Sequence, residues 1–161
     1  MGASQIVTIL ALDQATKHTG FAVFEGGKLM ECGVLNADQE LPIFARMNEM
    51  RLHIGDLVEK VRPDIVVFEQ VQYQQNQKVY SQLSQLQGFI MSILFQKDIP
   101  FYIVEPVVWK SFAGVKGRKR AEQKESTIAL AKLIYKVAVS EDAADAIFIG
   151  HWAAHNYKEQ L

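Results

Sequence analysis

Residues 6–20 read IVTILALDQATKHTG, and this stretch decides the fold. Its first seven residues, 6–12, are mostly apolar, with Thr8 the exception, and such a run predicts a strand that is covered on both faces of its sheet. The run ends abruptly at Asp13, and small polar residues and a glycine follow at once. A carboxylate at the end of a buried strand is either an ordinary turn residue or a group that is held there for chemistry.

Two later stretches repeat this pattern of a short apolar run that ends in an acid. DIVVFE, residues 64–69, ends in Glu69, and FYIVE, residues 101–105, ends in Glu105. The segments between these runs carry apolar side chains at helical spacing. Helical crossovers therefore join the three strands and make them mutually parallel.

The remaining elements complete a mixed α/β pattern. A Gly-Gly pair separates GFAVFE, residues 20–25, from KLMECGVL, residues 28–35, and predicts a tight antiparallel hairpin at one edge of the sheet. Helices are expected over residues 41–61, 79–94, 121–136 and 141–157, with a short helix or loop over 106–120. The expected fold is α/β, a mixed sheet with a central parallel part, an antiparallel hairpin edge and helices on both faces, in one domain over 1–161.

Composition narrows the class of protein. Of the 161 residues 49% are apolar, so one compact domain can bury a sizeable core. No apolar run approaches the roughly 20 residues of a membrane span, and MGASQIV at the start lacks the features of a secretory signal. Cys32 is the single cysteine, so no intramolecular disulfide can form. We therefore expect a cytoplasmic protein with no membrane partner.

The net charge of −1 gives no reason to expect a nucleic-acid partner, but the charge is unevenly distributed. Residues 110–124, KSFAGVKGRKRAEQK, carry six basic residues and one acidic one, a net charge of +5, so the rest of the chain carries −6. Such a segment is either a solvated loop or a place where phosphates dock and release counterions. The candidate DNA-binding residues in it are Lys110, Lys116, Arg118, Lys119, Arg120 and Lys124.

Acidic residues stand where such a fold would gather them. Parallel sheets bind ligands at the carboxyl ends of their strands, which is where Asp13 and Glu69 lie. Asp142 and Asp145 are three residues apart in SEDAADAIFIGHW, residues 140–152, so a helix puts both on one face. Four clustered carboxylates indicate hard divalent ions, Mg²⁺ or Mn²⁺. Two such ions about 4 Å apart are the usual device for attack on a phosphodiester.

LALDQATKHTGFAVF, DIVVFEQV and EDAADAIFIGHW resemble, in this order, the three active-site blocks of RuvC-type Holliday junction resolvases. The resemblance spans essentially the whole chain and implies a ribonuclease H-like fold, a homodimer and two Mg²⁺ or Mn²⁺ ions per active site. It also implies that the catalytic and metal-binding residues are Asp13, Glu69, Asp142 and Asp145. The short, divergent form suggests a phage-type member that acts in the host cytoplasm. The chain reads DQA in the first block, where bacterial members commonly read DPG.

We therefore predict a metal-dependent, structure-selective DNA endonuclease. It would cut four-way junctions, and other branched DNA such as forks and flaps, by paired nicks that leave 5′-phosphate and 3′-hydroxyl ends. Lys110 and Lys124 fall near positions where the family has lysines close to the scissile phosphate, and a lysine there can stabilise the charge of the attack. Gln72 and Tyr73, in the polar segment 70–78, are further candidate DNA contacts, through hydrogen bonds and base stacking respectively.

The sequence leaves alternatives open. A non-catalytic module that binds branched DNA would use the same fold, and a related nuclease would act on RNA or on single strands. LDQATKHTG also resembles the phosphate loop of actin-like ATPases, but 161 residues are too few for the two domains that those proteins need. Trp109 and Trp152 are predicted to pack in the core and not to stack on bases.

Overall fold

The computed structural model describes residues 6–157, so residues 1–5 and 158–161, the two ends of the predicted domain, lie outside the described residues. In chain order the elements are β1 (Thr8–Asp13), β2 (His18–Glu25), β3 (Lys28–Asn36), α1 (Ile43–Val61), β4 (Ile65–Glu69), α2 (Gln77–Gln96), β5 (Phe101–Val104), α3 (Pro106–Ala113), α4 (Arg120–Tyr135) and α5 (Glu141–Asn156). Among the helices described, none combines the length and the apolar character that crossing a membrane requires.

The five strands form one sheet in the order β3-β2-β1-β4-β5. β1, β4 and β5 run parallel, as the helical crossovers predicted. β2 and β3 form the predicted antiparallel hairpin beside β1. The two-residue turn between them is Gly26-Gly27, with φ values of 57° and 82° that glycine adopts without steric cost.

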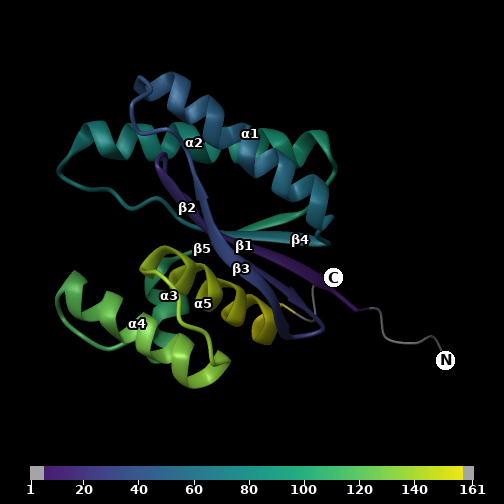
Figure 1. The fold of residues 1–161 in the computed structure, drawn as a ribbon, viewed down its shortest axis with the longest axis vertical. Helices are drawn as coiled ribbons and strands as arrows, with labels where there is room; N and C mark the ends of the chain where they lie inside the picture. The colour runs from purple at the N-terminus through teal and green to yellow at the C-terminus, as the bar shows by residue number, and fades with distance from the viewer. Residues whose placement is uncertain (1–5, 158–161) are drawn as a thin grey trace.

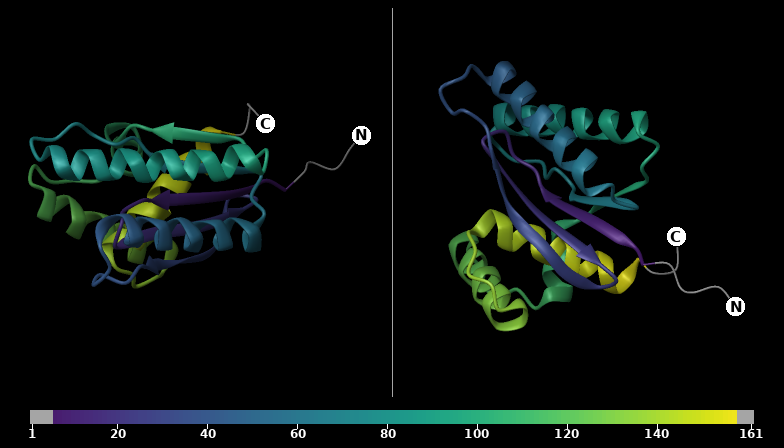
Figure 2. Two further views of the ribbon diagram at one scale, coloured as in Figure 1. Left: turned by 90° about the horizontal axis from the view of Figure 1, so that it is seen from above. Right: turned by 45° about the vertical axis from the view of Figure 1, so that its right-hand side comes forward.

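Helices cover both faces of the sheet, with α1 and α2 on one side and α3, α4 and α5 on the other (Figure 1). The right-hand view of Figure 2 shows the same two helical layers with the strands between them. Residues of β1 alternate between two cores: Leu10 and Leu12 pack beneath α1 and α2, whereas Ile9 and Ala11 pack beneath α5. All four are buried, so the run from Thr8 onward is confirmed as a strand covered on both faces, whereas Ile6, predicted to begin it, lies before the strand and is 70% exposed.

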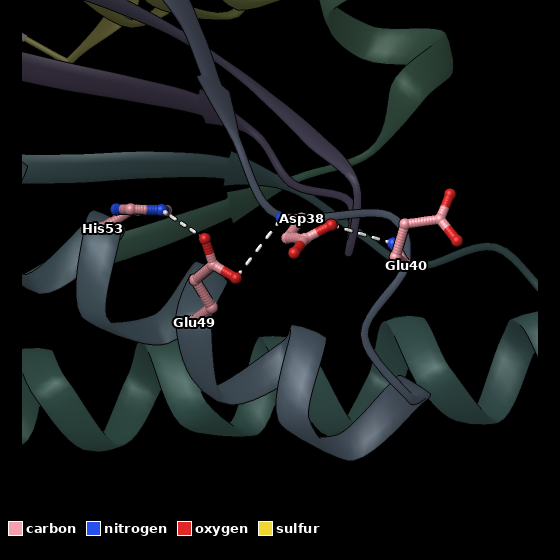
Figure 3. A network of polar contacts seen from close by, with 4 residues as sticks. All are labelled: Asp38, Glu40, Glu49 and His53. Carbon is pink, nitrogen blue, oxygen red and sulfur yellow. Dashed lines mark hydrogen bonds and ion pairs between the residues drawn. The ribbon is translucent and has the colours of Figure 1, made fainter.

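A small polar network ties the segment after β3 to α1 (Figure 3). Glu49 of α1 accepts a hydrogen bond from the backbone N–H of Asp38 at 3.3 Å and contacts His53, one turn later, at 3.3 Å. Asp38 accepts a hydrogen bond from the backbone N–H of Glu40 at 3.0 Å. None of these four residues lines the pocket described below, and the network joins the segment after β3 to the second and third turns of α1.

Several boundaries differ from the expectation by a few residues, and two of the differences have a clear local reason. α2 begins at Gln77, inside the predicted polar connection, because the Asn76 side chain caps it and accepts a first-turn N–H at 3.3 Å. The segment 106–120, predicted as a short helix or a loop, contains both. α3 ends at Ala113 because Gly114 takes a left-handed conformation with φ of 78° and stops the helix.

Candidate active site

The pairing of β1 with β4 brings Asp13 and Glu69 side by side. Their parallel register pairs Leu12 with Phe68, so Asp13 and Glu69 are the next residues on two neighbouring strands. Two residues earlier, the side chain on each strand belongs to the core beneath α5. Because side chains alternate along a strand, both carboxylates are directed to the face that α5 covers.

Asp142 and Asp145 approach the same place from α5. The Ser140 side chain caps this helix and accepts a first-turn N–H at 3.5 Å, as the sequence predicted. Gly20, the partner of Asp13 in the β1–β2 register, allows the helix to come close. A Cβ atom at Gly20 would lie 1.9 Å from the carbonyl oxygen of Asp142. The first turn of α5 can therefore rest on the strand only because this position carries no side chain.

The four predicted carboxylates all line one pocket of about 380 Å³. Three basic side chains line it as well: Lys110 from α3, and Arg120 and Lys124 from α4. Such a pocket offers ligands for a cation directly beside partners for a phosphate.

Burial raises the pKa of each of these carboxyl groups, and repulsion among the four adds to it at Asp13 and Asp145. Burial, followed by the charges of Asp145, Glu69 and Asp142, holds the pKa of Asp13 well above its usual value, and the Arg120 guanidinium opposes this only in part. Burial first and Glu69 next raise the pKa of Asp145 to about 7. Burial is also the largest cause of the raised pKa of Glu69 and of Asp142. A proton or a metal ion would relieve this repulsion.

The donor set fits a hard divalent ion, because carboxylate oxygens are the ligands that Mg²⁺ and Mn²⁺ prefer. Within residues 6–157 the ion pairs involve none of the four side chains, so their charge is left for an incoming cation. In the same range no three His, Cys, Asp or Glu side chains already converge as a closed metal cage. Separate carboxylates of this kind suit Mg²⁺, which keeps several waters and also binds substrate phosphates.

Most of the chain matches one protein family: the family model described as "Crossover junction endodeoxyribonuclease RuvC" aligns with residues 9–151. The chain belongs to the RuvC family. RuvC from Thermomicrobium roseum is 26% identical over 142 residues, which cover 86% of the chain and 87% of that protein. RuvC from Methylobacterium radiotolerans is 30% identical over 149 residues, which cover 89% of the chain and 70% of that protein. These RuvC relatives are bacterial, and the predicted phage origin stays a prediction.

Solved structures of similar fold include RuvC from Thermus thermophilus in complex with a Holliday junction substrate. It matches with a TM-score of 0.79 at 18% identity and covers 96% of both chains. A fowlpox virus resolvase in complex with Holliday junction DNA matches with a TM-score of 0.65 at 14% identity, over 94% of this chain and 99% of that one. The predicted ribonuclease H-like fold is confirmed. RuvC proteins are metal-dependent endonucleases, so the predicted class of enzyme is confirmed as well.

The predicted DNA-binding residues of this RuvC chain fall into two groups. Lys110, Arg120 and Lys124 line the pocket, whereas Lys116, Arg118 and Lys119 lie outside it in the exposed segment between α3 and α4. We call residues 114–119 the basic loop. Glu122 of α4 holds this loop, because its carboxylate accepts the backbone N–H groups of the last two loop residues at 2.9 and 3.4 Å.

The two lysines that line the pocket have partners other than the four carboxylates. Lys110 donates from Nζ to Oε1 of Gln123 at 3.2 Å. Lys124 donates from Nζ to Oε1 of Glu141 at 2.7 Å. Each lysine is therefore held at the pocket by α4 or α5, and neither forms an ion pair with the four predicted carboxylates; Glu141, the partner of Lys124, is a fifth acid that lines the pocket.

The two candidate contacts after β4 differ in their surroundings. Gln72 lines the pocket and donates a hydrogen bond to Glu105 at 3.0 Å. Tyr73 does not line it; its side chain is 75% exposed and packs edge-to-face on Tyr80, with the ring centroids 5.6 Å apart. An exposed aromatic side chain beside the pocket remains available for base stacking.

Sequence reasoning missed the side chains that hold Glu69. Trp109 is fully buried, as predicted, but it also donates from Nε1 to Oε2 of Glu69 at 2.6 Å. Gln14 and Gln87 donate from Nε2 to the backbone carbonyl of Glu69 at 2.7 and 3.1 Å. The one local signal was the polar Gln87 inside the apolar stripe of α2, whereas Trp109, the one buried residue of α3, gave no signal at all.

Proposed function

We propose that the chain resolves four-way DNA junctions by metal-dependent paired nicking, with forks and flaps as further substrates. The observation that carries this proposal is the gathering of four carboxylates from β1, β4 and α5 in one pocket that basic side chains also line. Membership of the family of crossover junction endodeoxyribonucleases supports it. So does the similarity in fold to two proteins that were solved with Holliday junction DNA.

The ligands that we propose for two Mg²⁺ or Mn²⁺ ions are Asp13, Glu69, Asp142 and Asp145. Bound ions of this kind activate water and stabilise the charge of a reacting phosphate. The chain places the carboxylates at fixed strand and helix ends, and Lys110 and Lys124 would add positive charge beside the phosphate. A water oxygen would join the phosphorus while the bond to the 3′ oxygen breaks. That oxygen takes up a proton, which leaves 5′-phosphate and 3′-hydroxyl ends.

Paired nicks in opposite strands require two such pockets on one junction. A homodimer with two-fold symmetry would provide them, because a four-way junction has approximate two-fold symmetry as well. Light scattering of the purified chain, alone and with an uncleavable junction, should give the mass of two protomers in the complex. A monomer that nicks one strand at a time would contradict the dimer.

End-labelled four-way, forked, flapped and linear duplex DNA, incubated with Mg²⁺ or with chelator, test the activity directly. Paired, symmetric nicks should appear in the four-way junction only when Mg²⁺ is present. Asp13→Asn should abolish cleavage and retain junction binding. Asp56→Asn is the matched control, because Asp56 is exposed on α1, outside the pocket, and should cut like the wild type.

The alternatives predict different results in the same assay. Junction binding without cleavage on any substrate would replace the proposal with a non-catalytic DNA-binding module. Preferential cleavage of RNA or of single strands would replace it with a related nuclease of other specificity. Wild-type cleavage by Asp13→Asn would refute the proposed metal ligands.

A further inference from the structure

Glu69 differs from the other three carboxylates in how firmly the fold holds it. Its backbone carbonyl accepts hydrogen bonds from Gln14, in the loop after β1, and from Gln87, on α2. Both glutamines are buried. With the main chain fixed from two elements, the freedom left to Glu69 lies in its side-chain torsions.

A third hydrogen bond removes much of that freedom. Trp109 Nε1 donates to Oε2 of Glu69 at 2.6 Å, a short contact of the charge-assisted kind. An indole has a single N–H and no acceptor, so this contact uses the whole hydrogen-bonding capacity of the Trp109 side chain. Within residues 6–157, Glu69 is the one carboxylate of the four whose side chain makes a hydrogen bond.

The position of Trp109 is itself fixed. β5 pairs with β4 so that Val104 lies opposite Glu69, and α3 starts two residues later, at Pro106. Trp109 is therefore on the first turn of a helix that leaves the sheet beside Glu69, and its side chain is fully buried in the core beneath α5. A buried ring in a close-packed core has little room to move.

The next residue on α3 belongs to the pocket wall. Lys110 lines the pocket, and its Nζ lies 5.5 Å from the centre of the Trp109 ring. One turn of α3 thus carries a donor that holds a carboxylate and a cation that can meet a phosphate. Moving α3 would disturb both at once.

We propose that Trp109 is a positioning residue of the metal site. It holds Oε2 of Glu69 and leaves Oε1 as the oxygen available to an ion, so the carboxylate is oriented before the ion arrives. This inference rests on the proposed role of Glu69 as a metal ligand. Partners that orient a metal ligand in this way typically contribute a factor of about 10 to 100 to metal affinity.

The chain contains two tryptophans, which makes the proposal testable by fluorescence. Trp152 stacks on Tyr102 with the ring centroids 5.4 Å apart and does not line the pocket. In Trp152→Phe the sole indole is therefore Trp109. Titration of this variant with Mg²⁺ in the absence of DNA should produce a saturable change in emission, because the ion draws on the carboxylate that binds the indole N–H. Trp109→Phe, which retains Trp152, should show no such change.

Calorimetric titration with Mg²⁺ gives the second readout, again without DNA. Trp109→Phe should bind Mg²⁺ about tenfold more weakly than the wild type, or weaker still. Trp152→Phe, the same substitution at the other tryptophan, should bind like the wild type. Circular dichroism and thermal melting establish that each variant is folded. If Trp109→Phe does not fold, the Mg²⁺ titration of Trp152→Phe decides the question alone.

Asp13→Asn separates the failure of this inference from the failure of the proposed function. If Asp13→Asn binds Mg²⁺ as well as the wild type does, the proposed metal site is wrong. If Asp13→Asn loses the ion while Trp109→Phe keeps wild-type affinity, the metal site stands and the role of Trp109 is refuted. A flat Mg²⁺ titration of Trp152→Phe, under conditions where calorimetry detects binding, refutes that role as well.

Discussion

Asp145→Asn should make the metal-free protein more stable, and more so as the pH rises. Burial and the neighbouring Glu69 raise the pKa of Asp145 from its usual 3.8 to about 7 in the folded chain. The folded state therefore binds this proton more tightly than the unfolded state does. The stability that the proton confers is fully present below pH 3.8 and is lost as the pH rises through about 7.

The size of the effect follows from these two pKa values. At 1.36 kcal/mol for each pKa unit, the difference between these two pKa values lowers the stability of the folded chain, relative to its stability below pH 3.8, by about 2 kcal/mol at pH 5 and about 4 kcal/mol by pH 8. Asparagine stays neutral, so the variant escapes this cost but buries an amide whose own cost does not depend on pH. The gain in stability of the variant over the wild type should thus grow by about 2–3 kcal/mol between pH 5 and pH 8.

Urea unfolding with a chelator at pH 5, 6, 7 and 8 measures this difference. Asp56→Asn, on the exposed side of α1, should show no such growth. With Mg²⁺ at 100 times its dissociation constant, the wild type should gain about 2.7 kcal/mol and the variant much less. A stability difference between Asp145→Asn and the wild type that is the same at every pH would refute the reasoning, because a pure packing effect has no pH dependence.

Three further predictions concern other parts of the chain. Gly20→Ala should lower the melting temperature and abolish cleavage, because the new Cβ would meet the Asp142 carbonyl oxygen, whereas Gly55→Ala, with open space around it, should do neither. Burial lowers the pKa of His151, the partner of Tyr135, to about 4, so its stabilising contribution is present above pH 6.5 and is lost towards pH 4. The free energy of unfolding of the wild type should therefore fall relative to that of His151→Gln over this range. Replacing the basic side chains of the basic loop with alanine should lower the salt dependence of junction binding by about 0.9 in log–log slope per lost phosphate contact. A wild-type slope would show that the loop does not touch DNA.

Local patterns in the sequence were enough to predict most of the sheet and the four carboxylates of the candidate site. The apolar runs that end at Asp13 and Glu69 have the length and continuity of buried strands, and the helical crossover between them requires parallel pairing. Two carboxylates at equivalent strand ends meet if their strands are neighbours, and the sheet order of the structure makes β1 and β4 neighbours. Asp142 and Asp145 followed from their helical spacing after Ser140, because capping and i,i+3 geometry are properties of a few consecutive residues.

Contacts between distant segments could not be predicted in this way. The hydrogen bond from Trp109 to Glu69 joins residues that are 40 positions apart, and a tryptophan on a buried helix face looks like any other core residue. The division of the basic segment depends on Gly114, which ends α3, and on the packing of α4 against α5. Those are facts of tertiary structure, so charge counting identified the segment without showing which of its cations reach the pocket.

The partners of the pocket lysines explain how positive and negative groups can share this site without cancelling each other. A direct ion pair between Lys110 or Lys124 and one of the four predicted carboxylates would neutralise both and leave less to bind an ion or a phosphate. The chain instead gives Lys110 an uncharged partner, Gln123, whereas Lys124 forms its ion pair with Glu141, a fifth acid that lines the pocket. The four carboxylates keep their raised pKa values and their affinity for cations, and Lys110, with its uncharged partner, keeps its charge for a phosphate. The instability predicted for the metal-free wild type is thus the direct consequence of an arrangement that is completed by metal ions and DNA.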